Sequence, residues 1–282
     1  MHAKIRNSVS KTFKNFSCAA VMGLMCSPVA MAHDFWLSPS DWQMDAPRPI
    51  ALDIMIGHPE DRMQWELKPH RVVSLRSISA AGITDLQSAM SGALPNGALM
   101  INGLREGTHM LTIETTSAIS VLDAAKFNAY IKEEGLTPIS DARKLAGTQD
   151  TEGRETYSRR GKALIRVGDD TASDAAFITK PLGMTLEVVP AVNPYEIEAG
   201  ETMPAQVYYR GNPAAGVTVG LIRLDDDSGI VALAKTDSAG MVTFSRPETG
   251  NWMLHAVWSD TLPKNSTADY DTIFSSLSFG WD

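Results

Sequence analysis

The chain has 282 residues, with 25 Lys and Arg against 33 Asp and Glu, so its formal net charge is −8. Its 44% hydrophobic and 21% charged residues exclude a disordered or fibrous chain, and its length allows one large domain or two of ordinary size. The acidic balance argues against a nucleic-acid or anionic-membrane binder, because both need a basic face.

The first 32 residues have the pattern of a secretory signal peptide. Four basic residues and no acidic one precede an apolar stretch at 16–25, and Ala30-Met31-Ala32 supplies an A-x-A cleavage site. We expect residues 1–32 to be removed and the product to reach the periplasm. Removal takes away both cysteines and four positive charges, so the net charge falls to −12 and thiol chemistry is excluded. No later stretch has ~20 apolar residues in a row, so we expect no integral membrane segment.

From residue 33 to 121, short apolar runs alternate with Gly, Pro and Asn, as in a β-sandwich. The residues of His109–Glu114 alternate between apolar and polar, which is typical of a half-buried strand. The expected strands of this first sandwich are Ile50–Ile56, Val72–Ile78, Ala98–Ile101 and Met110–Thr115.

Between residues 122 and 160 the hydrophobic period becomes that of a helix, with Gly135 as the expected C-cap. A second helix is expected over Asp141–Leu145, and the polar stretch Thr148–Arg160 is expected to be a loop or a helix extension. We interpret 122–160 as a short helical connector.

From residue 161 to 282 the β pattern returns, and turn signals separate the candidate strands. This spacing predicts a second sandwich of Ig-like or transthyretin-like type. The fold class is therefore mostly β, with two β-sandwich domains and a helical insertion between them. The expected strands are Ala163–Val167, Met184–Val189, Pro204–Tyr209, Val217–Leu224, Ile230–Lys235, Met241–Phe244 and Met253–Trp258, with Ser275–Phe279 closing either sheet.

An export signal followed at once by His33-Asp34-Phe35-Trp36-Leu37, and then by Gly57-His58, resembles the start of the DUF4198 family, whose members are also described as NikM-like or nickel-uptake-related periplasmic proteins. The resemblance extends to residue 252 and so covers nearly all of the exported chain. It implies a link to nickel or cobalt uptake, although the family is named for lacking an established activity. The C-terminal part also resembles prealbumin-like or Cna-B-like modules, which serve as spacers or binding platforms.

Cleavage after residue 32 would leave His33 first in the chain, where its α-amine and imidazole can chelate one metal ion. With a second imidazole this arrangement is a His brace, which suits Cu(II), Ni(II) and in some cases Zn(II). It resembles the metal end of CopC-type carriers and of lytic polysaccharide monooxygenases. The sequence has no H-x-x-x-H, H-E-x-x-H or C-x-x-C pattern, which excludes a helical or thiolate zinc site.

The remaining candidate ligands are few. His58 lies in an expected turn beside carboxylates, among them Asp61, and His109 lies in a strand of the first sandwich. The predicted metal ligands are therefore His33, His58, His109 and Asp61. We expect His70 and His255 to be structural or surface residues. Members of the family often carry a His shortly after the last tryptophan-containing strand, and this chain departs from that pattern, because the region has the sequence His255-Ala256-Val257-Trp258-Ser259.

These patterns predict a non-catalytic periplasmic protein that binds a divalent transition metal (Ni, Co, Cu or Zn) and no organic cofactor. A membrane or TonB-type transporter is the expected partner. Hydrolase and phosphate-loop motifs are missing from the sequence. Two alternatives remain open. A structural or interaction module of a cell-envelope transport system predicts an exposed apolar patch on one sheet, and a His-brace copper monooxygenase predicts peroxide-dependent oxidation of a substrate.

Overall fold

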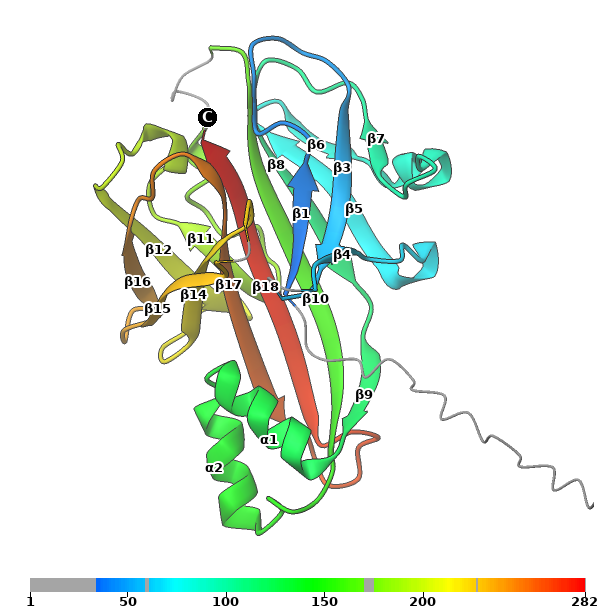
Figure 1. The fold of residues 1–282 in the computed structure, drawn as a ribbon, viewed down its shortest axis with the longest axis vertical. Coiled ribbons are helices and arrows are strands. Elements are labelled where there is room, and N and C mark those ends of the chain that lie inside the picture. Colours follow the sequence, from blue (N-terminus) through cyan, green and yellow to red (C-terminus); the bar gives the residue numbers. More distant parts are fainter. Residues whose placement is uncertain (1–33, 59–60, 170–174, 227, 282) are drawn as a thin grey trace, which may run out of the picture.

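The computed structural model describes residues 34–58, 61–169, 175–226 and 228–281 (Figure 1). Over these residues the protein is mostly β, as the sequence predicts, and its strands form three sheets beside one helical hairpin. None of the helices in this part of the chain is long and apolar enough to cross a membrane.

The largest sheet, called here the central sheet, has ten strands. Most neighbouring strands in this sheet are antiparallel, but β10 pairs with β18 in parallel. Two short strands also pair with β10: β2 (Gln43–Met44) in parallel and β9 (Ala118–Leu122) antiparallel. The other eight, in spatial order, are β15 (Ile230–Lys235), β14 (Thr218–Arg223), β17 (Gly250–Thr261), β18 (Tyr270–Trp281), β10 (Gly153–Val167), β8 (Gly107–Thr115), β5 (Val72–Ser79) and β6 (Gly82–Asp85).

Two four-stranded sheets pack on the central sheet. The N-terminal sheet contains β1 (Phe35–Pro39), β3 (Ile50–Ile56), β4 (Met63–Gln64) and β7 (Leu99–Ile101). The C-terminal sheet contains β11 (Leu186–Pro190), β12 (Thr202–Tyr209), β13 (Asn212–Pro213) and β16 (Met241–Ser245). Short 3-10 turns, η1 to η4, lie at Pro69–Arg71, Gln87–Gly92, Ala175–Phe177 and Pro194–Glu196.

The helical hairpin consists of α1 (Ala124–Glu133) and α2 (Thr137–Ala146). The Asp123 side chain caps α1 by accepting a hydrogen bond from the backbone N–H of Lys126 at 2.9 Å, and Gly147 ends α2 with a left-handed φ of 66°. The expectation of a loop or helix extension up to residue 160 is wrong, because strand β10 already begins at Gly153. The polar side chains of this stretch are accommodated by the hydrogen-bond ladders that β9 and β18 provide.

The two faces of the central sheet belong to different cores. On β10, Leu164 packs with the strands of the C-terminal sheet, whereas its neighbours Ala163 and Ile165 pack with the N-terminal sheet. The helical hairpin covers the same face of the central sheet as the N-terminal sheet. Phe274 of β18 packs against the hairpin, and the guanidinium of Arg159, on β10, lies 5.8 Å from the Phe274 ring. Figure 1 shows the hairpin below the N-terminal sheet on the long strands β17, β18 and β10.

The expected boundary between the helical connector and the second sandwich, at 160/161, falls inside β10. Strands from both halves of the chain therefore share the central sheet, and the two cores have that sheet in common. That the chain divides into separate folding units at residues 121 and 161 stays a prediction. In space, the hydrogen bonds of β10 connect the two halves.

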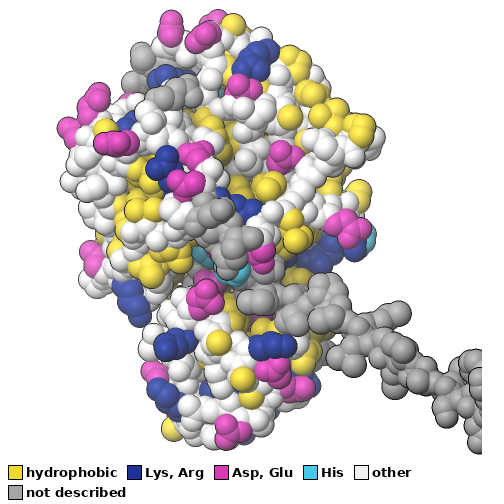
Figure 2. All heavy atoms as spheres, viewed as in Figure 1, with side chains coloured by type: hydrophobic (Ala, Val, Ile, Leu, Met, Phe, Trp, Pro, Cys, Tyr) yellow, Lys and Arg dark blue, Asp and Glu magenta, His cyan; other side chains and the backbone are white. Residues whose placement is uncertain are grey.

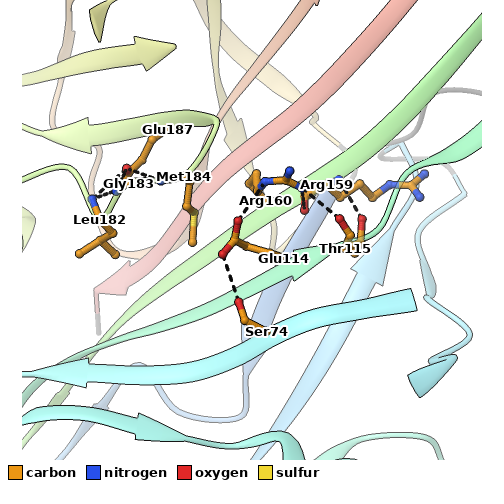
Figure 3. Close-up of polar contacts among 9 residues, drawn as sticks. All are labelled: Ser74, Glu114, Thr115, Arg159, Arg160, Leu182, Gly183, Met184 and Glu187. Atoms are coloured by element: carbon orange, nitrogen blue, oxygen red, sulfur yellow. Dashed lines mark hydrogen bonds and ion pairs between the residues drawn. The ribbon is translucent and has the colours of Figure 1, made fainter. Parts of the chain in front are cut away.

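A buried ion pair fastens the C-terminal sheet to the central sheet. Lys162 Nζ lies 2.9 Å from Glu187 Oε1, and both side chains are almost fully buried. Figure 3 shows the Glu187 carboxylate also receiving the backbone N–H groups of Leu182, Gly183 and Met184. The buried charge of Glu187 is tolerated because its carboxylate accepts hydrogen bonds from Lys162 and from these backbone N–H groups.

Replacing Glu187 with Ala should lower the free energy of unfolding by about 3–5 kcal/mol, because the ammonium of Lys162 would stay buried without its partner. Urea denaturation followed by tryptophan fluorescence measures the change. The exposed Glu248 is the matched control, and Glu248→Ala should leave the free energy of unfolding within about 0.5 kcal/mol of the wild-type value. Equal losses in the two variants would contradict the assignment of Glu187 as an anchor.

Candidate metal site

His255 forms a buried pair with Asp34 at the start of the described chain. His255 lies in the middle of β17, Asp34 immediately precedes β1, and their side chains approach to 3.1 Å between Nδ1 and Oδ1. Both residues are buried, with exposures of 6% for His255 and 7% for Asp34. The pair therefore joins the N-terminal sheet to the central sheet from within.

This contact decides which ring nitrogen of His255 is available to a ligand. A carboxylate only accepts hydrogen bonds, so neutral His255 must carry its proton on Nδ1 and present a bare lone pair at Nε2. That Nε2 is buried and has no hydrogen-bond partner among the described residues. Histidines that bind metals in proteins show the same arrangement, with one nitrogen donating to a carboxylate and the other facing the metal.

A second unpartnered polar atom lies beside it. Ser276 pairs directly with His255 across the β17–β18 ladder, so their side chains share one face of the central sheet. Within the described part of the chain, Ser276 Oγ is buried and also lacks a partner. Two neighbouring buried polar atoms are therefore left without partners among the described residues at this place.

His58 is brought to the same end of the N-terminal sheet by the pairing of β1 with β3. The backbone N–H of Gly57 donates to the carbonyl of Asp34 at 3.1 Å, so His58 follows directly after a residue bonded to Asp34. The turn closes because Gly57 has a φ of +127° and no Cβ, which would lie 2.7 Å from the carbonyl oxygen of Asp61. Asp61 Oδ1 in turn accepts from the backbone N–H of His58 at 2.6 Å.

The charge of His58 acts on the pKa of the His255 ring. Burial lowers the pKa of His255, the negative charge of Asp34 raises it, and the positive charge that His58 can carry lowers it. Near neutral pH the His255 ring is therefore neutral, which is the form that binds metals. Figure 2 shows histidine side chains at the narrow waist between the strands and the helical hairpin.

His109 lies elsewhere and has both ring nitrogens engaged. Its Nε2 donates to the carbonyl of Arg105 at 2.9 Å, and its Nδ1 lies 3.0 Å from the hydroxyl of Ser77. Burial lowers its pKa as well. His109 is thus already satisfied within β8 and β5, and the structure does not bring it together with His58 and Asp61.

His33 lies outside the described residues. Asp61 is exposed, and its carboxylate accepts a hydrogen bond from the backbone N–H of His58 within the turn. Among residues 34–58, 61–169, 175–226 and 228–281, no three His, Asp or Glu side chains are gathered closely enough to hold a metal ion by themselves. His70 is exposed in η1.

His255, which the sequence analysis expected to be a structural or surface residue, is buried and paired with Asp34. Strand spacing could not predict this contact, because it joins β17 to a segment near the opposite end of the chain.

A network of hydroxyl and carboxyl groups lies under α1, where Tyr130 contacts the central sheet. Glu155 Oε2 accepts hydrogen bonds from Thr272 at 2.6 Å and from Tyr130 at 3.3 Å, and Thr272 contacts Ser259 at 2.9 Å. We call these four residues the inner polar network. Burial raises the pKa of Glu155 to about 7, although both hydrogen bonds and the charge of Arg159 oppose the rise.

Another ionic contact of the central sheet is half-buried. Figure 3 shows the Glu114 carboxylate between Arg160, at 3.3 Å, and the hydroxyl of Ser74, at 3.1 Å. The hydroxyl of Thr115 accepts the backbone N–H of Arg159 at 2.9 Å. These contacts link β5, β8 and β10.

The chain matches the family described as "Domain of unknown function (DUF4198)" over residues 30–260. It belongs to the DUF4198 family. The match begins just before the Asp34 segment and ends just after β17 residue His255, so both halves of the buried pair lie within it. No curated protein matches the chain.

Among solved structures, the chain is similar at 9% identity to the "D0-D1 domain of Intimin", with 87% of this chain and 97% of that chain covered and a TM-score of 0.20. It is also similar at 9% identity to "Biofilm associated protein - BSP domain", with 86% of this chain and 29% of that chain covered and the same TM-score of 0.20. Because both TM-scores are low, these two structures say nothing about the site of the DUF4198 chain.

The two neighbours of His255 should shift its pKa in opposite directions. Asp34→Asn removes a negative charge, so the pKa of His255 should fall below its wild-type value. His58→Ala removes a positive charge, so the pKa should rise. NMR titration of the His255 ring measures both, and the exposed His70 serves as the internal reference. Shifts of the same sign would contradict the arrangement described above.

Proposed function

We propose that this protein binds a divalent transition-metal ion (Ni, Co or Cu) as cargo, outside the cytoplasm, after removal of residues 1–32. The observation that carries the proposal is the buried Nε2 of His255, which lacks a partner among the described residues while Asp34 holds the other nitrogen. His58 would supply the second imidazole, and its charge already acts on the pKa of His255. His33 is the expected third ligand, because cleavage after residue 32 would add its α-amine.

The donor set favours this class of ion. Imidazole and amine nitrogens suit Cu(II), Ni(II), Co(II) and Zn(II), whereas Mg²⁺ and Ca²⁺ prefer oxygen ligands. The exported chain would have no thiol, which argues against a Cu(I) thiolate site. Asp34 would act as the outer partner that holds the His255 ring in its tautomer, and Asp61 would hold the His58 turn rather than contact the ion.

A carrier role is supported better than a catalytic one. The ligands proposed here lie on strands and turns, and in the described part of the chain the hydroxyl of Ser276 makes no hydrogen bond to the His255 ring that would activate it as a nucleophile. Membership in DUF4198 is compatible with an accessory of metal uptake, and a membrane or TonB-type transporter would be the recipient. Peroxide-dependent oxidation by the copper-loaded protein would instead identify a monooxygenase.

The proposal predicts a single site whose affinity depends on His255. Isothermal titration of the cleaved, metal-free protein with Ni(II), and with Cu(II) in a second series, measures the dissociation constant. His255→Ala and His58→Ala should each weaken binding by more than 100-fold, since each removes a ligand, and Asp34→Asn should weaken it by about 10–100-fold, since it removes only the outer partner.

His70→Ala is the matched control, and it should leave the dissociation constant unchanged because His70 is exposed in η1. His109→Gln tests the remaining predicted ligand; its ring already has two partners, so no change is expected. One extra Ala ahead of His33 should weaken binding, because it moves the α-amine away from the imidazole. Wild-type protein without a site, or a His255→Ala variant with full affinity, would refute the proposal.

One observation favours the second candidate, an interaction module. The edge strand β15 exposes Ile230, Val231 and Leu233 to between 51% and 58%, beside a groove of about 460 Å³ that Phe244 and Pro247 also line. An exposed apolar edge is typical of a surface that meets another chain. If Leu233→Lys abolishes association with the envelope while metal binding is absent in the wild type, the module replaces the carrier.

A further inference from the structure

The strands on either side of His255 carry small residues at its level of the central sheet. His255 pairs with Gly220 of β14 on one side and with Ser276 of β18 on the other. Ser276 pairs in turn with Gly161 of β10, and Figure 1 shows these strands side by side. Residues paired directly across a ladder place their side chains on the same face of the sheet. The imidazole of His255 and the hydroxyl of Ser276 are therefore neighbours in a row that ends in a glycine on each side.

The row lies on the face of the central sheet that the N-terminal sheet and the helical hairpin cover. Phe274, two residues before Ser276 on β18, belongs to the hairpin core and stacks on the His255 ring at 6.4 Å. Alternate residues of a strand share a face, so the side chain of Ser276 points the same way as that of Phe274. At the other end of the row, a Cβ on Gly161 would lie 3.3 Å from the ring of Phe35 in β1. The hydroxyl of Ser276 is thus enclosed between two cores of this face.

The hydroxyl of Ser276 has no partner there, although a serine beside it on the same face has one. Ser276 has an exposure of 0%, and no described residue forms a hydrogen bond with its Oγ. Ser278, equally buried and two residues further along β18, donates to the carbonyl oxygen of Leu37 at 2.6 Å. Buried hydroxyl groups in proteins generally have a hydrogen-bond partner, so the bare oxygen of Ser276 needs an explanation.

We propose that the hydroxyl oxygen of Ser276 is a ligand of the metal ion bound at Nε2 of His255, and that this oxygen sets which ions the site prefers. The inference rests on the proposed function. One ion accepts the lone pair of the buried ring nitrogen and a lone pair of the buried oxygen, and so gives both unpartnered atoms a partner. The hydroxyl coordinates through its lone pair and keeps its proton.

The spacing of the two strands allows one ion to reach both side chains. Neighbouring strands lie about 4.8 Å apart. Two ligand atoms bonded to one ion at about 2.1 Å each are at most about 4 Å apart. A ring and a hydroxyl that extend from directly paired positions on the same face can therefore converge on a single ion.

The chemistry of the oxygen bears on selectivity. A neutral hydroxyl beside imidazole nitrogens gives a nitrogen-rich site with one hard ligand, which suits Ni(II), Co(II) and Cu(II) better than the soft Cu(I) ion. A thiolate at the same position would favour softer ions. Position 276 is therefore where one side chain can change the preference of the site without removing an imidazole.

Replacing Ser276 with Cys tests the contact directly. Both cysteines of the chain lie in residues 1–32, so the cleaved protein has no other thiol. A thiol that binds a metal ion loses its proton, and a thiolate bonded to Co(II) gives an intense charge-transfer absorption in the near ultraviolet. Cleaved Ser276→Cys loaded with Co(II) should show this absorption, and its preference for Zn(II) over Ni(II) should rise relative to the wild type.

Ser275→Cys is the matched control. Ser275 is the adjacent residue of β18, it is also buried, and its hydroxyl also lacks a partner among the described residues. Its side chain points to the opposite face of the central sheet, because successive residues of a strand alternate. Co(II)-loaded Ser275→Cys should therefore lack the charge-transfer absorption.

A smaller substitution guards against a cysteine variant that folds poorly. Ser276→Ala removes the hydroxyl and adds no atom to the buried place. It should weaken Co(II) binding by about 10-fold, less than His255→Ala, because water can take the vacated position. It should also shift the visible spectrum of the bound Co(II), which reports the ligands of the ion and which a change in stability alone would not move. Ser275→Ala should leave the affinity and the spectrum unchanged.

The outcomes separate the role of Ser276 from the metal site itself. Suppose that the wild type binds Co(II), Ser276→Cys shows no charge-transfer absorption, and Ser276→Ala keeps the affinity and spectrum of the wild type. The role of Ser276 would then be overturned, its hydroxyl would bind water only, and the site at His255 would stand. An equally strong absorption in Ser275→Cys would also overturn it. Absence of Co(II), Ni(II) and Cu(II) binding in the wild type would overturn the metal site and, with it, the role of Ser276.

Discussion

The contact between His255 and Asp34 is the constraint on which the proposed site depends. It joins the middle of the longest antiparallel ladder, β17–β18, to the residue just before β1. The carboxylate can only accept, so it holds the ring in one tautomer and leaves Nε2 bare. A buried ring nitrogen without a partner is costly unless something binds it, and this makes the place chemically distinct from the satisfied histidine at His109.

The sheets explain why that contact can form. β10 pairs with strands from both halves of the chain, so the N-terminal sheet and the helical hairpin come to lie side by side on one face of the central sheet. His255 lies at the junction between them, stacked at 6.4 Å on Phe274, which belongs to the hairpin core. The rigid surroundings hold the side chains in place before any ligand arrives, which lowers the entropic cost of binding.

Burial near this junction shifts the pKa values of two groups in opposite directions. It lowers the pKa of His255, which keeps that ring neutral near pH 7, and it raises the pKa of Glu155 to about 7, with the hydroxyls of Thr272 and Tyr130 as donors to the carboxylate. In water these groups would titrate at their ordinary values. The difference follows from desolvation, which disfavours the charged form of each group.

From the sequence alone, the mostly β fold, the helical hairpin and most strand positions follow, because they rest on local periodicity and turn residues: Ile50–Ile56 and Ile230–Lys235 were predicted with the observed bounds. The turn that carries His58 was also predicted, because Gly57 marks it in the sequence. The start of β10 at Gly153 and the buried contact of His255 with Asp34 were missed. Both depend on partners far away in the chain, namely β18 for the strand and Asp34 for the ring. Only tertiary packing decides which side chains meet, since strand pairing sets register between segments that local patterns cannot connect.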